Sequence, residues 1–124
     1  MYVVSESEQR TTVTPAGAMS GLAGPSQGST EISTWRVELG AGASTPVHII
    51  DREQVWMPLW GEFEAEVDGR CEQVTAGQAL ILPAGVVRQL RTAGGPGAAL
   101  VAMAVGGRAL MPGSDTGIPL PWAE

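Results

Sequence analysis

One histidine, one glutamine and one arginine are the side chains of this chain best suited to chemistry on a small molecule. His48 is the only histidine, and it lies with Gln54 in the stretch GASTPVHIIDREQVWMPLWG. Arg88 follows in GQALILPAGVVRQL. An imidazole transfers protons near neutral pH, an amide both donates and accepts hydrogen bonds, and a guanidinium binds anionic oxygens. This set predicts acid–base catalysis, with Arg88 holding a carboxylate or a developing enolate.

Apolar side chains near these residues predict a substrate site. Trp56 and Trp60 share the parity of Gln54 along one expected strand, so they would form flat walls for an aromatic or polycyclic compound. The remaining predicted contacts are Ile50, on the His48 face, and Leu90, on the Arg88 face. A simpler alternative stays open, in which the tryptophans only fill a small barrel and Arg88 only bridges to a nearby carboxylate, Asp51 or Glu53.

The elements that must position these residues are short strands. Seventeen glycines and nine prolines separate apolar runs too short for helices, which favours an all-β domain. Residues 31–39 alternate as a half-buried strand, and residues 54–60 are apolar on both faces, so we expect cover on both sides. Asp68 and Gly69 predict a two-residue hairpin turn. The other expected strands are residues 47–50, 62–67, 70–74, 79–82, 86–91 and 98–105.

Pro58 interrupts the strand expected over residues 54–60. Proline has no backbone N–H to donate to a neighbouring strand, so we expect it at a sheet edge or at a β-bulge.

The spacing of the two stretches resembles the two motifs of the cupin superfamily, G-x5-H-x-H-x3,4-E-x6-G and G-x5-P-x-G-x2-H-x3-N. The first motif is matched by Gly42, His48 and Gly61. The second is matched by Gly77, Pro83 and Gly85, and it continues to Arg88 and Thr92. The resemblance implies the cupin-type double-stranded β-helix, a jelly-roll barrel, as one domain over residues 1–124. We expect N-terminal strands or an arm in residues 1–30, the barrel core in 31–105 and a tail in 106–124.

The four metal-ligand positions of the resembled family are altered in this chain. They are occupied by His48, Ile50, Gln54 (or Glu53, if the turn is one residue shorter) and Arg88. A catalytic metal normally has three protein ligands, and a guanidinium repels a divalent ion. The sequence therefore predicts no metal cofactor; a weakly bound divalent ion would use His48 and Gln54 with Asp51 or Glu53.

Three functional hypotheses follow. The first is a small cupin enzyme of the isomerase, epimerase, cyclase or dehydratase type, acting on an anionic or aromatic substrate in secondary metabolism. The second is a cupin that binds a small ligand without catalysis. The third is a metal-dependent, dioxygenase-like cupin. Because cupins often dimerise through N-terminal strands, residues 1–30 also predict a homodimer.

Charge and composition narrow the partners and the location. A net charge of -6, with seven arginines and no lysine, argues against nucleic acid and anionic membranes as partners. The first residues lack the pattern of a secretory signal, which predicts a cytoplasmic protein. Cys71 is the only cysteine, so it is expected to be structural or incidental.

Overall fold

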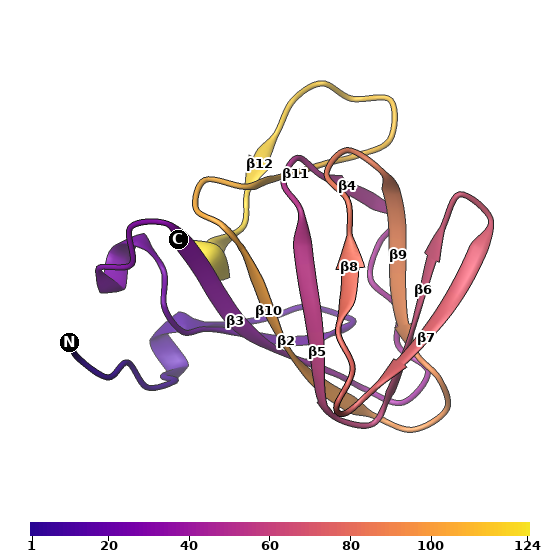
Figure 1. Ribbon diagram of the computed structural model, residues 1–124, viewed down its shortest axis with the longest axis horizontal. Helices are drawn as coiled ribbons and strands as arrows, with labels where there is room; N and C mark the ends of the chain where they lie inside the picture. The colour runs from indigo at the N-terminus through magenta and orange to yellow at the C-terminus, as the bar shows by residue number, and fades with distance from the viewer.

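The computed structural model describes residues 1–124 as twelve strands and three short 3-10 helices (Figure 1). The strands form two antiparallel six-stranded sheets, with the orders β1-β2-β3-β10-β5-β8 (sheet A) and β12-β11-β4-β9-β6-β7 (sheet B). The strands of sheet A are β1 (Thr11–Val13), β2 (Gly17–Gly21), β3 (Ile32–Leu39), β5 (Gln54–Trp60), β8 (Leu80–Leu82) and β10 (Gly97–Ala104). Those of sheet B are β4 (His48–Ile50), β6 (Glu62–Val67), β7 (Arg70–Thr75), β9 (Val87–Thr92), β11 (Arg108–Leu110) and β12 (Ile118–Pro119). The helices are η1 (Glu8–Arg10), η2 (Pro25–Gln27) and η3 (Pro121–Ala123). Each helix has only three residues, so none of them could span a bilayer.

Local turn chemistry accounts for the hairpin between β6 and β7. Val67 pairs with Arg70 across the turn, and both turn residues have positive φ, 51° for Asp68 and 75° for Gly69. These angles suit a two-residue hairpin, because Asp and Gly adopt left-handed backbone more readily than other residues. The predicted hairpin is therefore confirmed.

The core forms where the inner faces of the sheets meet. On β3, the alternate residues Ser33, Trp35, Val37 and Leu39 are each no more than 2% exposed. Trp56 of β5 and Phe63 of β6 pack with ring centroids 5.9 Å apart. The alternation predicted for residues 31–39 is thus confirmed, and it places Trp35 and Val37 on the inner face of sheet A.

A β-bulge lies at Pro58 in β5. Pro58 pairs with Ala99 of β10 while Trp60 pairs with Ala98, so β5 contains one extra residue at this point. Of the two positions expected for Pro58, a sheet edge or a β-bulge, the bulge is confirmed, because β5 lies between β10 and β8. Gly61 follows with φ of 79°, and a Cβ there would lie 2.6 Å from the Gly97 Cα, which explains why glycine closes this strand.

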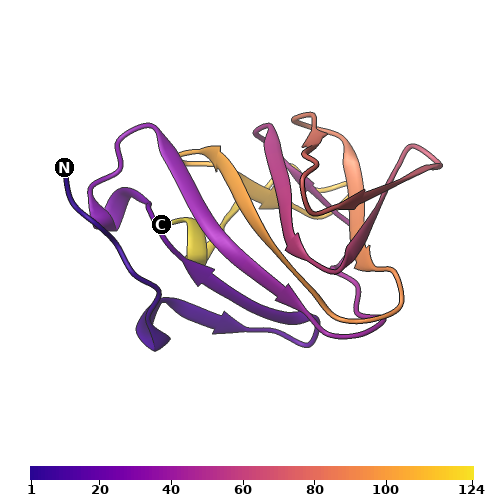
Figure 2. The same cartoon turned by 60° about the horizontal axis from the view of Figure 1, so that its bottom comes forward.

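The two chain ends add strands to the two sheets. Strand β2 pairs with β3 of the same chain, so β1 and β2 extend sheet A (Figure 2). The tail contributes β11, which pairs with β4, and then η3, which lies near the N-terminal strands in Figure 1. The strands β11 and β12 were not predicted from the sequence.

Candidate functional site

A cavity of about 580 Å³ opens into the space between the two sheets. It is lined mainly by apolar and aromatic side chains, and His48 is the only titratable residue in its wall. The apolar lining residues are Pro15, Ala16, Met19, Trp35, Val37, Pro46, Ile50, Trp56, Ala109, Met111, Leu120 and Trp122. The polar ones are Thr14, Ser44, Thr45, His48, Gln54 and Gln89.

His48 enters the cavity wall from β4 as a neutral imidazole. Its Nδ1 lies 2.6 Å from the Pro46 carbonyl oxygen. Because a carbonyl only accepts, Nδ1 carries the proton, and Nε2 is left as an unprotonated acceptor with no partner in the chain. Burial, as the largest cause, and the nearby Arg88 charge lower the pKa of His48, although the Pro46 carbonyl opposes this shift. The imidazole is therefore a base at neutral pH.

Gln54 lines the same cavity from the start of β5. Its Oε1 accepts hydrogen bonds from Arg88 Nη1 at 3.3 Å and from Trp56 Nε1 at 3.5 Å. Its Nε2 has only a weak partner, the Met103 sulfur at 3.8 Å. Both groups that contact Oε1 are hydrogen-bond donors, so the amide atom at this position must be the oxygen and not the nitrogen.

Arg88 lies behind Gln54 and not in the cavity wall. Its side chain comes from β9, next to His48 in the pairing of β4 with β9, and it is fully buried. Nε donates to the Val86 carbonyl at 3.2 Å and Nη2 donates to the Pro83 carbonyl. No carboxylate pairs with it, and burial lowers the pKa of the guanidinium to about 10, so Arg88 is still charged at neutral pH.

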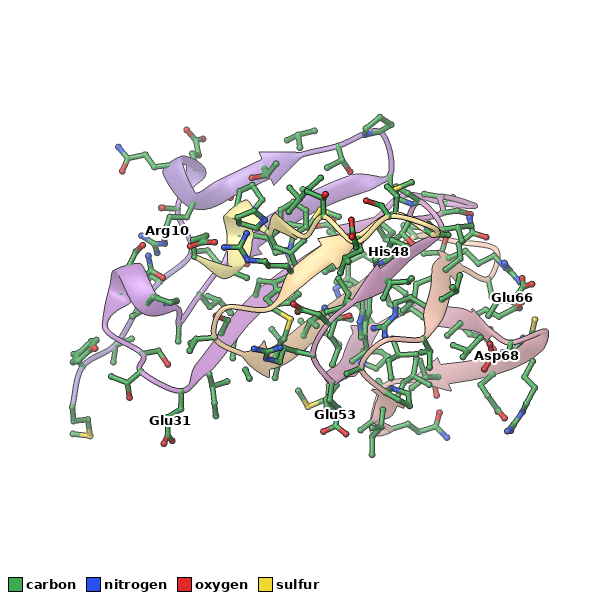
Figure 3. All side chains as sticks on the ribbon, turned by 90° about the horizontal axis from the view of Figure 1, so that it is seen from above. Arg10, Glu31, His48, Glu53, Glu66 and Asp68 are labelled. Carbon is green, nitrogen blue, oxygen red and sulfur yellow. The ribbon has the colours of Figure 1, made fainter.

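The side chains at the family's ligand positions do not fit a metal ion. Ile50 offers no donor atom, Arg88 brings a positive charge, and the Gln54 oxygen is already bonded to that charge. Neither candidate carboxylate lines the cavity: Asp51 Oδ1 accepts from the Arg108 backbone N–H at 2.7 Å, and Glu53 is exposed at the periphery, away from His48 (Figure 3). No group of three metal-binding side chains occurs in the chain.

The structure brings together some of the predicted site residues and separates others. His48, Ile50, Gln54 and Trp56 line one cavity. Trp60 does not, because the bulge at Pro58 reverses the parity of β5 and leaves Trp60 42% exposed. Leu90 belongs to the buried core beside the cavity, and Arg88 reaches the cavity only through Gln54.

Several lining residues were missed in the sequence. Trp35 could have been found from the sequence, because the alternating pattern of residues 31–39 puts it on the buried face of that strand. Trp122 lies in the tail, where no periodicity marks it, and it reaches the wall through η3. With Trp56, these residues give the cavity three tryptophans.

Comparison with known proteins identifies the fold. No family model matches the sequence, and no curated protein matches it. Among solved structures, the polyketide cyclase RemF from Streptomyces resistomycificus aligns with a TM-score of 0.70 at 21% identity, over 84% of this chain and 75% of that chain. A cupin 2 domain-containing protein from Halorhodospira halophila aligns with a TM-score of 0.72 at 22% identity, over 92% and 84%.

Two further structures agree with this result. KdgF from Halomonas sp. aligns with a TM-score of 0.66 at 17% identity, over 75% of this chain and 82% of that chain. The S161A mutant of Bacillus subtilis oxalate decarboxylase aligns with a TM-score of 0.74 at 14% identity, and the match covers 85% of this chain but only 30% of the decarboxylase. Identities below 25% carry the fold alone. The two antiparallel sheets, the paired motif spacing and these neighbours together show that this chain has the cupin-superfamily fold.

Proposed function

We propose that this protein is a small-molecule cupin enzyme that transfers protons on a neutral, aromatic or polycyclic substrate, without a metal. The observation that carries the proposal is the cavity itself: about 580 Å³, walled by three tryptophans, with one neutral histidine as its only titratable group. A cavity of this size accommodates most of a drug-sized organic molecule. Isomerase, epimerase, cyclase and dehydratase reactions all fit this description.

The charge distribution narrows the substrate from the sequence-based expectation. The sequence left anionic and aromatic substrates open, because Arg88 could have gripped a carboxylate. In the structure, no arginine lines the cavity, and the Arg88 donors contact two carbonyls and Gln54. Removing a carboxylate from water into this apolar cavity would cost free energy without a direct ion pair in return. A carboxylate substrate is therefore disfavoured, and a substrate that enters the cavity without a formal charge is favoured.

His48 Nε2 is suited to act as the general base. A C–H bond next to a substrate carbonyl breaks, its proton bonds to Nε2, and the electron pair moves onto the carbonyl oxygen. Return of the proton to a different atom gives isomerisation. Ring closure follows if the α-carbon of the enolate bonds to a second carbonyl carbon of the same molecule: the π bond of that carbonyl breaks, its electron pair moves onto the oxygen, and the oxygen takes the proton back from His48 Nε2. The likeness to the polyketide cyclase RemF supports this reaction class, although at 21% identity it supports no particular substrate.

Deuterium exchange tests this proposal without knowledge of the natural substrate. The probe is 2-tetralone, a neutral aromatic ketone, whose α-hydrogens exchange in D2O through the enolate and are followed by NMR. We expect exchange well above the buffer rate, and a loss of about 10² to 10⁴-fold in the His48→Gln protein, the usual range for removing a general base.

Two results would contradict the proposal. If 2-tetralone binds but exchanges at the buffer rate, the result supports a cupin that binds a ligand without catalysis. If exchange survives in His48→Gln but disappears with a chelator, the result supports a metal-dependent cupin. The surface variant Arg70→Gln, far from the cavity wall in an exposed ion pair with Glu72, serves as the matched control.

We further propose a homodimer, formed through the outer face of sheet A. The outward residues of β5, expected to be covered, are exposed in the single chain: Met57 is 37% and Leu59 44% exposed. Ile81 of β8, 62% exposed, pairs with Val55 beside them, so the apolar residues are contiguous across two strands. Such a patch is typical of a protein interface. Strands β1 and β2 lie in the chain's own sheet, so a dimer through residues 1–30 has less support.

Light scattering at micromolar concentration measures the assembly. We expect a dimeric mass for the wild type and a monomeric mass for Ile81→Asp; a monomeric wild type would overturn this arrangement. A role in secondary metabolism and a cytoplasmic location remain predictions, which the genomic neighbourhood and cell fractionation would test.

A further inference from the structure

We propose that Gln54 and Arg88 form a subsite for an anionic oxygen, in which Gln54 donates to the oxygen and Arg88 is a positioning residue acting through Gln54. The ligand class is a neutral aromatic carbonyl or hydroxyl compound that becomes an enolate or aryloxide when bound. The inference rests on the proposed function for its reaction, but the subsite can be tested by binding alone.

The Gln54 amide is oriented so that its nitrogen keeps a hydrogen to donate. Arg88 and Trp56 both donate to Oε1, so this oxygen already has two donors and is not free to accept a hydrogen bond from a ligand. The amide nitrogen carries two hydrogens, and the chain offers it only the Met103 sulfur at 3.8 Å. A cavity-lining residue is thus left with a spare donor, which an acceptor oxygen on a ligand would satisfy.

Arg88 brings an uncompensated positive charge to this subsite. A buried guanidinium without a carboxylate partner is costly, since hydrogen bonds to carbonyls replace only part of its hydration. Arg88 nevertheless lies fully buried and is bonded to Pro83, Val86 and Gln54. Its positive charge is therefore available to stabilise negative charge that develops on the far side of the Gln54 amide.

The proton balance links this subsite to His48. When a bound hydroxyl or α-carbon gives its proton to His48 Nε2, the electron pair stays on the ligand oxygen and the imidazole becomes positive. The positive charge of Arg88 stabilises the negative ligand oxygen and destabilises the positive imidazolium. Its charge is the smallest of the three causes that shift the pKa of His48, whereas its Nη1 contacts the amide directly at 3.3 Å. The effect on the oxygen should therefore exceed the effect on the base.

Binding of 2-naphthol at several pH values tests the subsite, because the absorbance spectra of naphthol and naphtholate differ. Burial in an apolar cavity alone would raise the pKa of bound naphthol. We expect the wild-type protein to offset this burial, so that naphtholate binds at least as tightly as naphthol. In Gln54→Leu, naphtholate should bind about tenfold more weakly relative to naphthol, the scale of a charge-assisted hydrogen bond. Arg88→Met should show the same loss, and Arg88→Lys should restore part of it.

The controls separate this inference from the proposed function. Arg91→Met removes a partly exposed arginine of the same strand, on the opposite face from Arg88, and should leave the preference unchanged. His48→Gln should retain the naphtholate preference, because the proton can pass to solvent; loss of exchange activity with this preference intact would confirm both roles. If Arg88→Met fails to fold, Gln54→Leu still decides the question. A wild type that prefers neutral naphthol as strongly as Gln54→Leu does would overturn the subsite.

Discussion

Two arginines three residues apart on β9 have opposite surroundings. Arg91 is on the outer side of sheet B, where Nη2 pairs with Glu64 and Nη1 pairs with Glu66 at 3.3 Å. Arg88 is fully buried and has no carboxylate partner. Both were visible in the sequence as charged residues in one strand, yet only their partners distinguish a surface ion pair from a charge kept inside the fold.

This difference indicates which of the two arginines has a functional role. Solvent-accessible ion pairs such as the partly exposed ones of Arg91 contribute roughly 0 to 1 kcal/mol and need no explanation beyond solubility and local order. A buried charge without an opposite charge is a cost to folding, and buried groups of this kind concentrate at functional sites. Arg88 lies directly behind a cavity-lining amide. A role in ligand binding would explain why the fold retains this destabilising charge.

A carboxylate partner introduced next to Arg88 would remove the difference between the paired Arg91 and the unpaired Arg88. Of the changes considered, it should have the largest effect on stability. In Gln54→Glu, the new carboxylate meets the guanidinium at the place where the amide oxygen now lies, 3.3 Å from Nη1. We expect the free energy of unfolding at neutral pH to rise by roughly 1 to 3 kcal/mol, because an unpaired buried charge becomes a pair. Urea denaturation measures this change.

The matched control is Glu64→Gln, which takes a carboxylate from Arg91. Because that pair is partly exposed to solvent, the loss should stay below about 1 kcal/mol. If Gln54→Glu were destabilising, or if the two variants had equal and opposite effects, the view of Arg88 as an unpaired buried charge would be wrong.

A smaller effect is expected from the pH dependence of stability. His48 is the only histidine, and its pKa is lowered from 6.5 in the folded protein. The unfolded chain therefore takes up a proton first as the pH falls below 6.5, so folding stability decreases between that value and the lower folded pKa. Above pH 6.5 the contribution is fully present.

In His48→Gln, the stability curve should be flatter across this window, since carboxylates titrate mainly below it. Thermal unfolding at a series of pH values from 5 to 8 measures the slope. An identical slope in wild type and variant would show that the imidazole is not held neutral by its surroundings.

The sequence predicted the parts of this molecule that depend on local chemistry. The turn at Asp68 and Gly69, the alternation of β3 and the bulge at Pro58 follow from properties of single residues and their neighbours. The spacing within two motifs, from Gly42 to Gly61 and from Gly77 to Gly85, pointed to the cupin fold. Four predicted site residues do line one cavity.

The rest depends on distant pairing and on side-chain length. The sequence could not show that Ala109 pairs with Ile50, which brings the tail and Trp122 to the cavity. It also could not show that Trp60 leaves the inner face after the bulge, because parity is lost at one extra residue. The reach of Arg88 to the Pro83 and Gln54 oxygens likewise depends on packing between two sheets.

The ionisation of bound 2-naphthol, compared between wild-type protein and Gln54→Glu, shows whether the uncompensated charge of Arg88 acts on the cavity through the Gln54 amide. We expect wild-type protein to bind naphtholate at least as tightly as naphthol. Gln54→Glu, with the charge neutralised and the donor removed, should bind naphtholate more than tenfold more weakly. Equal preference in the two proteins would contradict this role of Arg88.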